Sequence, residues 1–112
     1  MSDLSNTAFE KVQKDTPVVT EQQASTLLAQ VPDWEIVSRD GVQQLQRNYS
    51  FKNFVDAMGF ANRITELAEQ ENHHPSILVE WGRVRVTWWT HIIHGLHQND
   101  FVMAARSDRA YA

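Results

Sequence analysis

The chain of 112 residues contains no cysteine, and this absence excludes several kinds of chemistry at once. Without a thiol there is no disulfide framework, no thiolate metal site and no cysteine nucleophile. Glycine and proline are also sparse, with 4 and 3 residues, which leaves little room for long linkers. The composition fits a reducing compartment, and we expect a cytoplasmic location.

Long hydrophobic runs and clustered positive charge are missing as well. No apolar stretch has the length of a signal-peptide core or a membrane span, so we expect neither secretion nor membrane insertion. The 10 Lys and Arg residues are scattered along a chain of net charge -4. Proteins that bind nucleic acid through phosphates need clustered basic residues. We therefore expect neither nucleic acid nor membranes as partners.

The length is that of one domain, and we expect an arm in front of it. Residues 1–19 mix polar and charged types with isolated apolar ones, which predicts an arm that is flexible or docks on the body and carries no chemistry. Residues 20–112 are the expected domain. It begins with a capping-box pattern, Thr20 with Gln23, followed by apolar residues at helical spacing.

Two pairs of strand-like segments alternate with helical segments along this domain. The expected strands are 34–37, 45–49, 77–81 and 83–91, with turns at Asp40-Gly41 and Gly82. We expect an α+β fold with two layers, in which a four-stranded antiparallel sheet has helices packed on one face, in the order α-β-β-α-β-β-α. Trp89 and Tyr49 are expected on the opposite face, which would be solvated or buried by another subunit, so we expect an oligomer.

Two helices follow from the same patterns. The central helix is expected to be capped by Ser50, to run to about Gln70, and to bury one face that includes Phe54 and Met58. The last helix is expected to begin near Asp100.

Three of the five histidines are expected to meet. His73 and His74 follow the central helix, and Pro75 stops any continuation of that helix. His91 lies nine residues after Gly82 and His73 nine residues before it, so a hairpin centred on Gly82 brings them together. Adjacent side chains of an extended segment point to opposite sides, so His73 and His74 share a site only if their junction is irregular.

A cluster of imidazoles is suited to acid–base chemistry near neutral pH. Elimination of water needs one group that protonates the leaving hydroxyl and another that removes a proton. Asp100 and Glu69 are placed to orient the rings or to bind a polar substrate. The alternatives are a histidine pair that is only a loop feature, and a zinc site of three imidazoles. Metal binding is disfavoured for His91, His94 and His97 because Gly95 and the preceding strand interrupt any continuous helix, and His94 and His97 are expected to be surface residues.

The spacing of these residues forms one pattern. It consists of Glu69, His73-His74-Pro75, Trp81, Thr90-His91, Gly95-Leu96 and Asp100. The pattern resembles the pterin-4a-carbinolamine dehydratase family, bacterial 4a-hydroxytetrahydrobiopterin dehydratases included, over roughly residues 20 to 108. Two positions depart from it: Asn72 stands where many animal members have Asp, and His97 stands where Ser or Thr often caps the last helix. We expect the second change to weaken that cap by ~1 kcal/mol.

The resemblance implies a hydro-lyase that converts 4a-hydroxytetrahydrobiopterin to quinonoid dihydropterin and water. It implies that this reaction recycles the pterin of an aromatic amino acid hydroxylase, with no metal or organic cofactor, in a homodimer or homotetramer. The residues implied to supply acid–base chemistry are His73, His74 and His91. Those implied to line the pterin site are Asn72, Trp89, Thr90 and Asp100, with Glu69 beside them.

The resemblance also supplies two further hypotheses. Some animal members bind a homeodomain transcription factor, which implies a protein-binding scaffold or coactivator-type dimerisation partner with secondary catalysis. An accessory role in maturation of a pterin-dependent cofactor is the other. The complete set of His73, His74, His91 and Asp100 argues against loss of activity.

Overall fold

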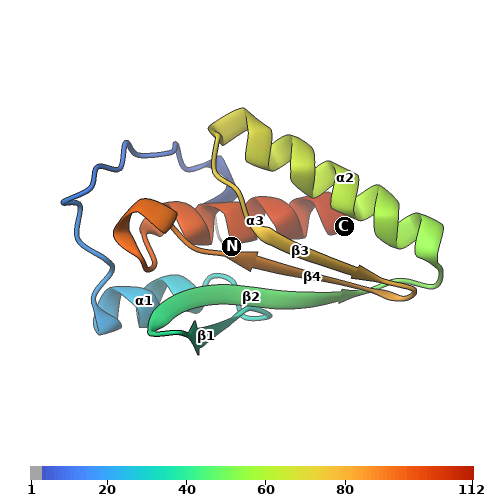
Figure 1. The fold of residues 1–112 in the computed structure, drawn as a ribbon, viewed down its shortest axis with the longest axis horizontal. Coiled ribbons are helices and arrows are strands. Elements are labelled where there is room, and N and C mark those ends of the chain that lie inside the picture. Colours follow the sequence, from blue (N-terminus) through green and yellow to red (C-terminus); the bar gives the residue numbers. More distant parts are fainter. Residues whose placement is uncertain (1–3) are drawn as a thin grey trace.

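The two expected hairpins join into one antiparallel sheet in the computed structural model, which describes residues 4–112. β1 (Glu35–Arg39) pairs with β2 (Val42–Ser50), and β3 (Ser76–Glu80) pairs with β4 (Arg83–Trp88). β2 also pairs with β4, which gives the strand order β1-β2-β4-β3 (Figure 1). The expected four-stranded sheet is confirmed, although its last strand ends three residues before His91.

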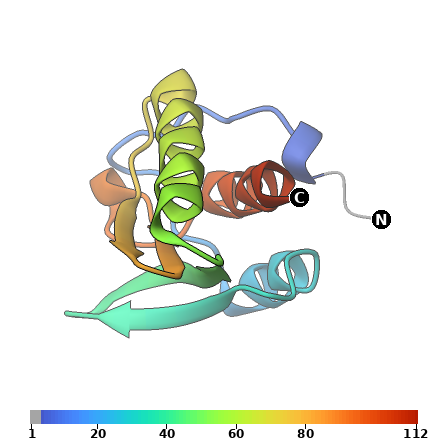
Figure 2. The ribbon, with the colours of Figure 1, turned by 90° about the vertical axis from the view of Figure 1, so that its right-hand side faces the viewer.

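Three α-helices complete the fold: α1 (Glu21–Leu28), α2 (Phe54–Glu71) and α3 (Gln98–Tyr111). Helices α2 and α3 pack against the sheet, and α1 packs against α3 (Figure 2). Short 3₁₀ helices occur at Leu4–Asn6 (η1) and His91–Ile93 (η2). The order of the α-helices and strands confirms the α+β prediction. None of the helices within residues 4–112 is long and apolar enough to cross a membrane.

The core lies between the sheet and the helices, and β4 supplies its centre. Val84, Val86 and Trp88 alternate along this strand and are all fully buried. Alternate residues of a strand lie on one face, so this side of β4 faces the helices throughout. Phe101 of α3 and Phe60 of α2 are also fully buried in this core.

Tyr49 corrects the expectation for the open sheet face. Its side chain is 1% exposed and lies in the core, because the register of β2 pairs it with Val84. The charge of Arg47, two residues earlier on the same face, concealed this pattern in the sequence. Asp108 of α3 forms an ion pair with Arg47, with 2.7 Å between the guanidinium nitrogen and the carboxylate oxygen, which allows a charged residue at the edge of the core.

The start of α2 also differs from the expectation. Asn53 is the cap, since its side-chain oxygen accepts the Asp56 amide at 2.7 Å, whereas Ser50 is the last residue of β2. Phe54 and Met58 are exposed rather than buried. The buried stripe of the helix is narrower than the apolar pattern and consists of Ala57, Phe60, Ala61, Ile64 and Ala68. The capping box of Thr20 at the start of α1 is confirmed.

Three hydrogen-bond donors bind one carboxylate near the C-terminal end of α3. Asp108 Oδ1 accepts hydrogen bonds from the Tyr49 hydroxyl at 2.6 Å, from Arg47 at 2.7 Å and from the Trp34 indole at 3.0 Å. Burial, and next the hydrogen bond to Asp108 and its negative charge, raise the pKa of the Tyr49 hydroxyl above its ordinary value of 10.0. The folded protein therefore holds this hydroxyl protonated at pH values where the unfolded chain ionises it.

This difference predicts a loss of stability in alkali. Below pH 10 Tyr49 is protonated in both states and adds no pH dependence. Above pH 10 the unfolded state releases the proton first, so Tyr49 should lower the free energy of unfolding by about 1.4 kcal/mol for each further pH unit. Urea unfolding of the wild type and of Tyr49→Phe between pH 8 and 11 measures the effect. The variant should lack this part of the slope; equal slopes would contradict the assignment.

Candidate functional site

The junction between α2 and β3 is irregular, as a shared histidine site requires. The helix ends at Asn72, which adopts the left-handed conformation with φ of 50°. Asn tolerates this conformation better than most side chains. The His73 amide then donates to the Ala68 carbonyl at 3.0 Å, and β3 begins only at Ser76. His73 and His74 therefore escape the strict alternation of a strand.

A tight loop follows β4 on the neighbouring segment. The Thr90 amide donates to the Gly95 carbonyl at 2.8 Å, and the residues between them form η2. His91 is thus the first residue of a 3₁₀ helix and not part of the strand, which corrects its expected setting. A Cβ at Gly95 would lie 2.6 Å from Val18 Cγ1, so only glycine fits this loop without a shift of the chain that packs on it.

The two junctions border one open cavity of about 560 Å³, a size typical of small-molecule sites. His73, His74 and His91 all line it, which confirms that the three imidazoles gather at one end of the hairpin. Asn72 and Thr90 line it too. The remaining lining residues are Phe9, Glu10, Lys11, Val12, Glu71, Ile92 and Asn99.

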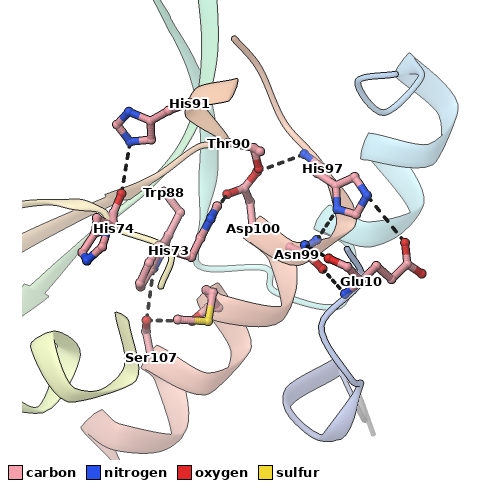
Figure 3. Close-up of polar contacts among 11 residues, drawn as sticks. Glu10, His73, His74, Trp88, Thr90, His91, His97, Asn99, Asp100 and Ser107 are labelled. Atoms are coloured by element: carbon pink, nitrogen blue, oxygen red, sulfur yellow. Dashed lines mark hydrogen bonds and ion pairs between the residues drawn. The ribbon is translucent and has the colours of Figure 1, made fainter. Parts of the chain in front are cut away.

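All three histidines use the same ring nitrogen to bind the protein, and Figure 3 shows this for His73 and His91. Nε2 lies 2.7 Å from Asp100 Oδ1 in His73, 2.7 Å from Glu69 Oε2 in His74, and 3.2 Å from the His74 carbonyl oxygen in His91. Carboxylate and carbonyl oxygens accept hydrogen bonds, so each Nε2 carries a proton and donates it. No residue in the described part of the chain forms a hydrogen bond with any of the three Nδ1 atoms.

The three rings differ in their exposure to solvent. The His73 side chain is 12% exposed and stacks on Trp88, with ring centroids 5.7 Å apart. The His74 side chain is 54% exposed. His91 is also exposed, and its ring stacks on Trp89 with centroids 4.4 Å apart. One ring is therefore fixed in a shielded setting and two are open to water.

Asp100 is the buried centre of the site. Its side chain is fully buried, and its second oxygen, Oδ2, accepts hydrogen bonds from the Thr90 hydroxyl at 2.7 Å and the His97 amide at 2.9 Å. Asp100 is not among the residues that line the cavity, and it contacts the lining residue His73 through Oδ1. Glu69 and Trp89 likewise lie outside the cavity lining and contact His74 and His91.

His97 is not the surface residue that the sequence suggests. It is 8% exposed and caps α3, because its Nδ1 accepts the Asn99 amide at 3.0 Å. The Asp100 side chain accepts the His97 amide in return, which completes a capping box. An imidazole nitrogen thus replaces the usual hydroxyl, and α3 begins at Gln98 rather than near Asp100. His94 is exposed as expected.

The arm takes one of the two arrangements expected for it. It docks on the body, and Phe9, Glu10, Lys11 and Val12 line the histidine cavity. Residues 1–3 of the expected arm lie outside the described residues. The only sequence signal was the pair of isolated apolar residues, Phe9 and Val12. Within residues 4–112, no three His, Cys, Asp or Glu side chains are grouped so as to hold a metal ion.

Comparison with known proteins gives a consistent result. The family model described as pterin 4 alpha carbinolamine dehydratase matches residues 17–110. A Marinobacter nauticus protein with the provisional name pterin-4-alpha-carbinolamine dehydratase is 51% identical over 111 residues, which cover 99% of this chain and 100% of that protein.

Two solved structures have the same fold. A crystal structure of a transcriptional coactivator/pterin dehydratase from Brucella melitensis is 30% identical with a TM-score of 0.78, and the match covers 86% of this chain and 100% of that one. A pterin dehydratase-like protein described as a RuBisCO assembly factor in the α-carboxysome is 20% identical with a TM-score of 0.61, over 71% of this chain and 90% of that one. At this identity the second likeness shows the fold alone.

The hydrogen bonds of Asp100 predict how the site responds to its removal. Asp100→Ala leaves three donors, on His73, Thr90 and His97, without their acceptor, and should lower the free energy of unfolding by about 3–5 kcal/mol. Asp100→Asn keeps an acceptor for two of them and should cost about 1–2 kcal/mol. Its amide would donate to His73 Nε2 and move the ring proton to Nδ1.

Urea unfolding measures the first effect, and ¹⁵N chemical shifts of the imidazole nitrogens report the tautomer of His73. Equal stability of Asp100→Ala and the wild type, or an unchanged tautomer in Asp100→Asn, would contradict this description of the site.

Proposed function

Since this chain belongs to the pterin 4 alpha carbinolamine dehydratase family, we propose that it dehydrates a 4a-hydroxytetrahydropterin to the quinonoid dihydropterin and water. The observation that supports this most is the meeting of three imidazoles at one cavity, each with Nδ1 left for a ligand. We propose 4a-hydroxytetrahydrobiopterin as the substrate.

The reaction needs two proton transfers and no redox step. A protonated imidazole donates a proton to the 4a-hydroxyl, the C4a–O bond breaks, and water leaves. A neutral imidazole removes the proton from N5, and the C4a–N5 double bond forms. After the reaction the acid has lost one proton and the base has gained one. Proton exchange of the two imidazoles with solvent restores their starting protonation states. General acid–base catalysis of this kind contributes about 10²–10⁴-fold in rate.

The exposure of the three imidazole rings suggests which histidines transfer protons and which one contacts the substrate. His74 and His91 are open to water, so they exchange protons with solvent between turnovers. The protons of their Nε2 atoms are held by Glu69 and by the His74 carbonyl, and Nδ1 is the atom that acts on the substrate. His73 is shielded and fixed by Asp100, and we assign it a contact with the reacting ring at the base of the cavity. Asn72 and Thr90 complete the contacts to the pterin.

The physiological setting follows from the chemistry of the substrate. A 4a-hydroxytetrahydropterin forms when a hydroxylase uses a tetrahydropterin to activate oxygen, so we propose an aromatic amino acid hydroxylase of the cytoplasm as the source. A scaffold or coactivator role is the second candidate, because the Brucella melitensis structure is described as a transcriptional coactivator as well as a pterin dehydratase. That role predicts a protein interaction that survives replacement of all three histidines.

The decisive measurement is the decay of freshly generated 4a-hydroxytetrahydrobiopterin with and without the protein. We expect acceleration over the spontaneous rate, and a loss of about 10²-fold in His74→Ala and in His91→Ala, since each removes one proton-transfer group. His94→Ala is the matched control, because His94 is an exposed histidine of the same loop that does not line the cavity. Absence of acceleration by the wild type would refute the proposal.

We also propose that the protein is a homodimer or homotetramer. β3 is an edge strand of the sheet, and its residue Leu78 is 45% exposed. An edge strand with an exposed apolar side chain favours pairing with a second chain. Light scattering after size-exclusion chromatography should give a mass that is two or four times that of one chain. Leu78→Lys should shift it towards the monomer, and a monomeric wild type would contradict this proposal.

A further inference from the structure

The arm is fastened to α3 next to the catalytic cavity. The buried side chain of Asn99 binds both backbone groups of Glu10: its oxygen accepts the amide at 3.0 Å, and its nitrogen donates to the carbonyl at 2.9 Å (Figure 3). His97 Nε2 lies 3.5 Å from the Glu10 carboxylate. These contacts fix both the position and the direction of the chain at Glu10.

A second attachment holds the chain on the other side of Phe9. Arg106 donates to the carbonyls of Ser5 at 3.2 Å and Thr7 at 3.0 Å, and it forms an ion pair with Glu71 of α2. Leu4 is buried in the core at the start of this segment. The segment from Leu4 to Glu10 is therefore docked at several points, and the residues between and after the attachments are placed precisely.

Phe9 lies between these attachments and contacts His73, the most shielded of the three cavity histidines. Its ring meets the His73 ring edge-on, with centroids 5.4 Å apart and planes at 70°. Trp88 stacks flat on the same imidazole, and Asp100 holds its Nε2. A single hydrogen bond leaves the ring free to tilt about that atom. The two aromatic contacts remove this freedom, and Phe9 is the only one of the three that comes from the arm.

We propose that the arm segment 9–12 is one wall of the substrate pocket and that Phe9 is a positioning residue for His73. This inference rests on the proposed function and adds to it a part of the site that lies before the family match at residues 17–110. Residues of the arm, of the α2–β3 junction and of η2 together line the cavity. A flat pterin ring that contacts the histidines would therefore also contact the arm. Its loss would admit water and loosen the ligand.

Two variants separate the wall from the positioning effect. Asn99→Asp is almost isosteric, but it places a carboxylate oxygen against the Glu10 carbonyl and so releases the arm. A carboxylate in the first turn of α3 is favourable for the helix, so this variant should fold. Phe9→Ala removes the contact with His73, and Phe9→Leu restores an apolar side chain there. Lys14→Ala is the control, because Lys14 is an exposed arm residue outside the cavity lining.

Two assays are applied to each variant, namely dehydratase kinetics and calorimetric binding of 7,8-dihydrobiopterin, which has the pterin ring but no 4a-hydroxyl. Asn99→Asp should raise KM and the Kd of dihydrobiopterin about tenfold, and it should also lower kcat, because the released arm takes Phe9 away from His73. Phe9→Ala should lower kcat about tenfold, with a smaller change in Kd, and Phe9→Leu should recover part of it. Lys14→Ala should match the wild type.

The outcomes distinguish this inference from the proposed function. An active wild type whose Asn99→Asp and Phe9→Ala variants, confirmed as folded by circular dichroism, have wild-type kcat, KM and Kd would overturn the inference alone. A wild type that binds dihydrobiopterin without dehydratase activity would overturn the proposed function, and the binding data would still test the wall. A wild type that neither binds dihydrobiopterin nor accelerates the dehydration would overturn both.

Discussion

The buried carboxylate of Asp100 is the constraint on which the site depends. Its two oxygens bind three segments, namely His73 after α2, Thr90 after β4, and the His97 amide at the start of α3. A buried carboxylate is tolerated only when donors surround it, so these segments must meet in one arrangement for the chain to fold. The position at the first turn of α3 adds a favourable interaction with the helix dipole. The residue that holds the His73 ring is thus also a residue that stabilises the fold.

Local sequence patterns predicted most of the fold, and long-range contacts explain what they missed. Alternation along β4 and the symmetry of the hairpin about Gly82 were enough to bring His73 and His91 together. Tyr49 was misplaced because its burial depends on Asp108, which is 59 residues away in sequence. His97 was misread because an imidazole that caps a helix has no pattern of its own. The docking of the arm depends on Asn99, which is 89 residues from Glu10 in sequence. Because the arm has few apolar residues, its sequence pattern does not predict this docking.

The histidines show how one residue type is given different settings by its partners. Each ring donates through Nε2, to a buried carboxylate, an exposed carboxylate or a backbone carbonyl. The hydrogen bond fixes the tautomer and leaves Nδ1 for the ligand, as in other sites where the second ring nitrogen sets the role of the first. What then differs is access to water: His73 is shielded by aromatic rings, whereas His74 and His91 are exposed. The proposed cycle of two proton transfers would need both a fixed geometry and exchange with solvent, and the fixed ring and the exposed rings are different histidines.

The boundary of the family match does not coincide with the boundary of the cavity. The match begins at residue 17, whereas the cavity lining begins at Phe9. The Marinobacter nauticus relative aligns over 99% of this chain, so the aligned region of that protein includes the arm segment. The Brucella melitensis structure matches 86% of this chain over its own full length, so the two chains share the fold without sharing every segment. The arm residues that line the cavity therefore lie outside the part of the chain that the family model matches, although the Marinobacter nauticus protein aligns with them.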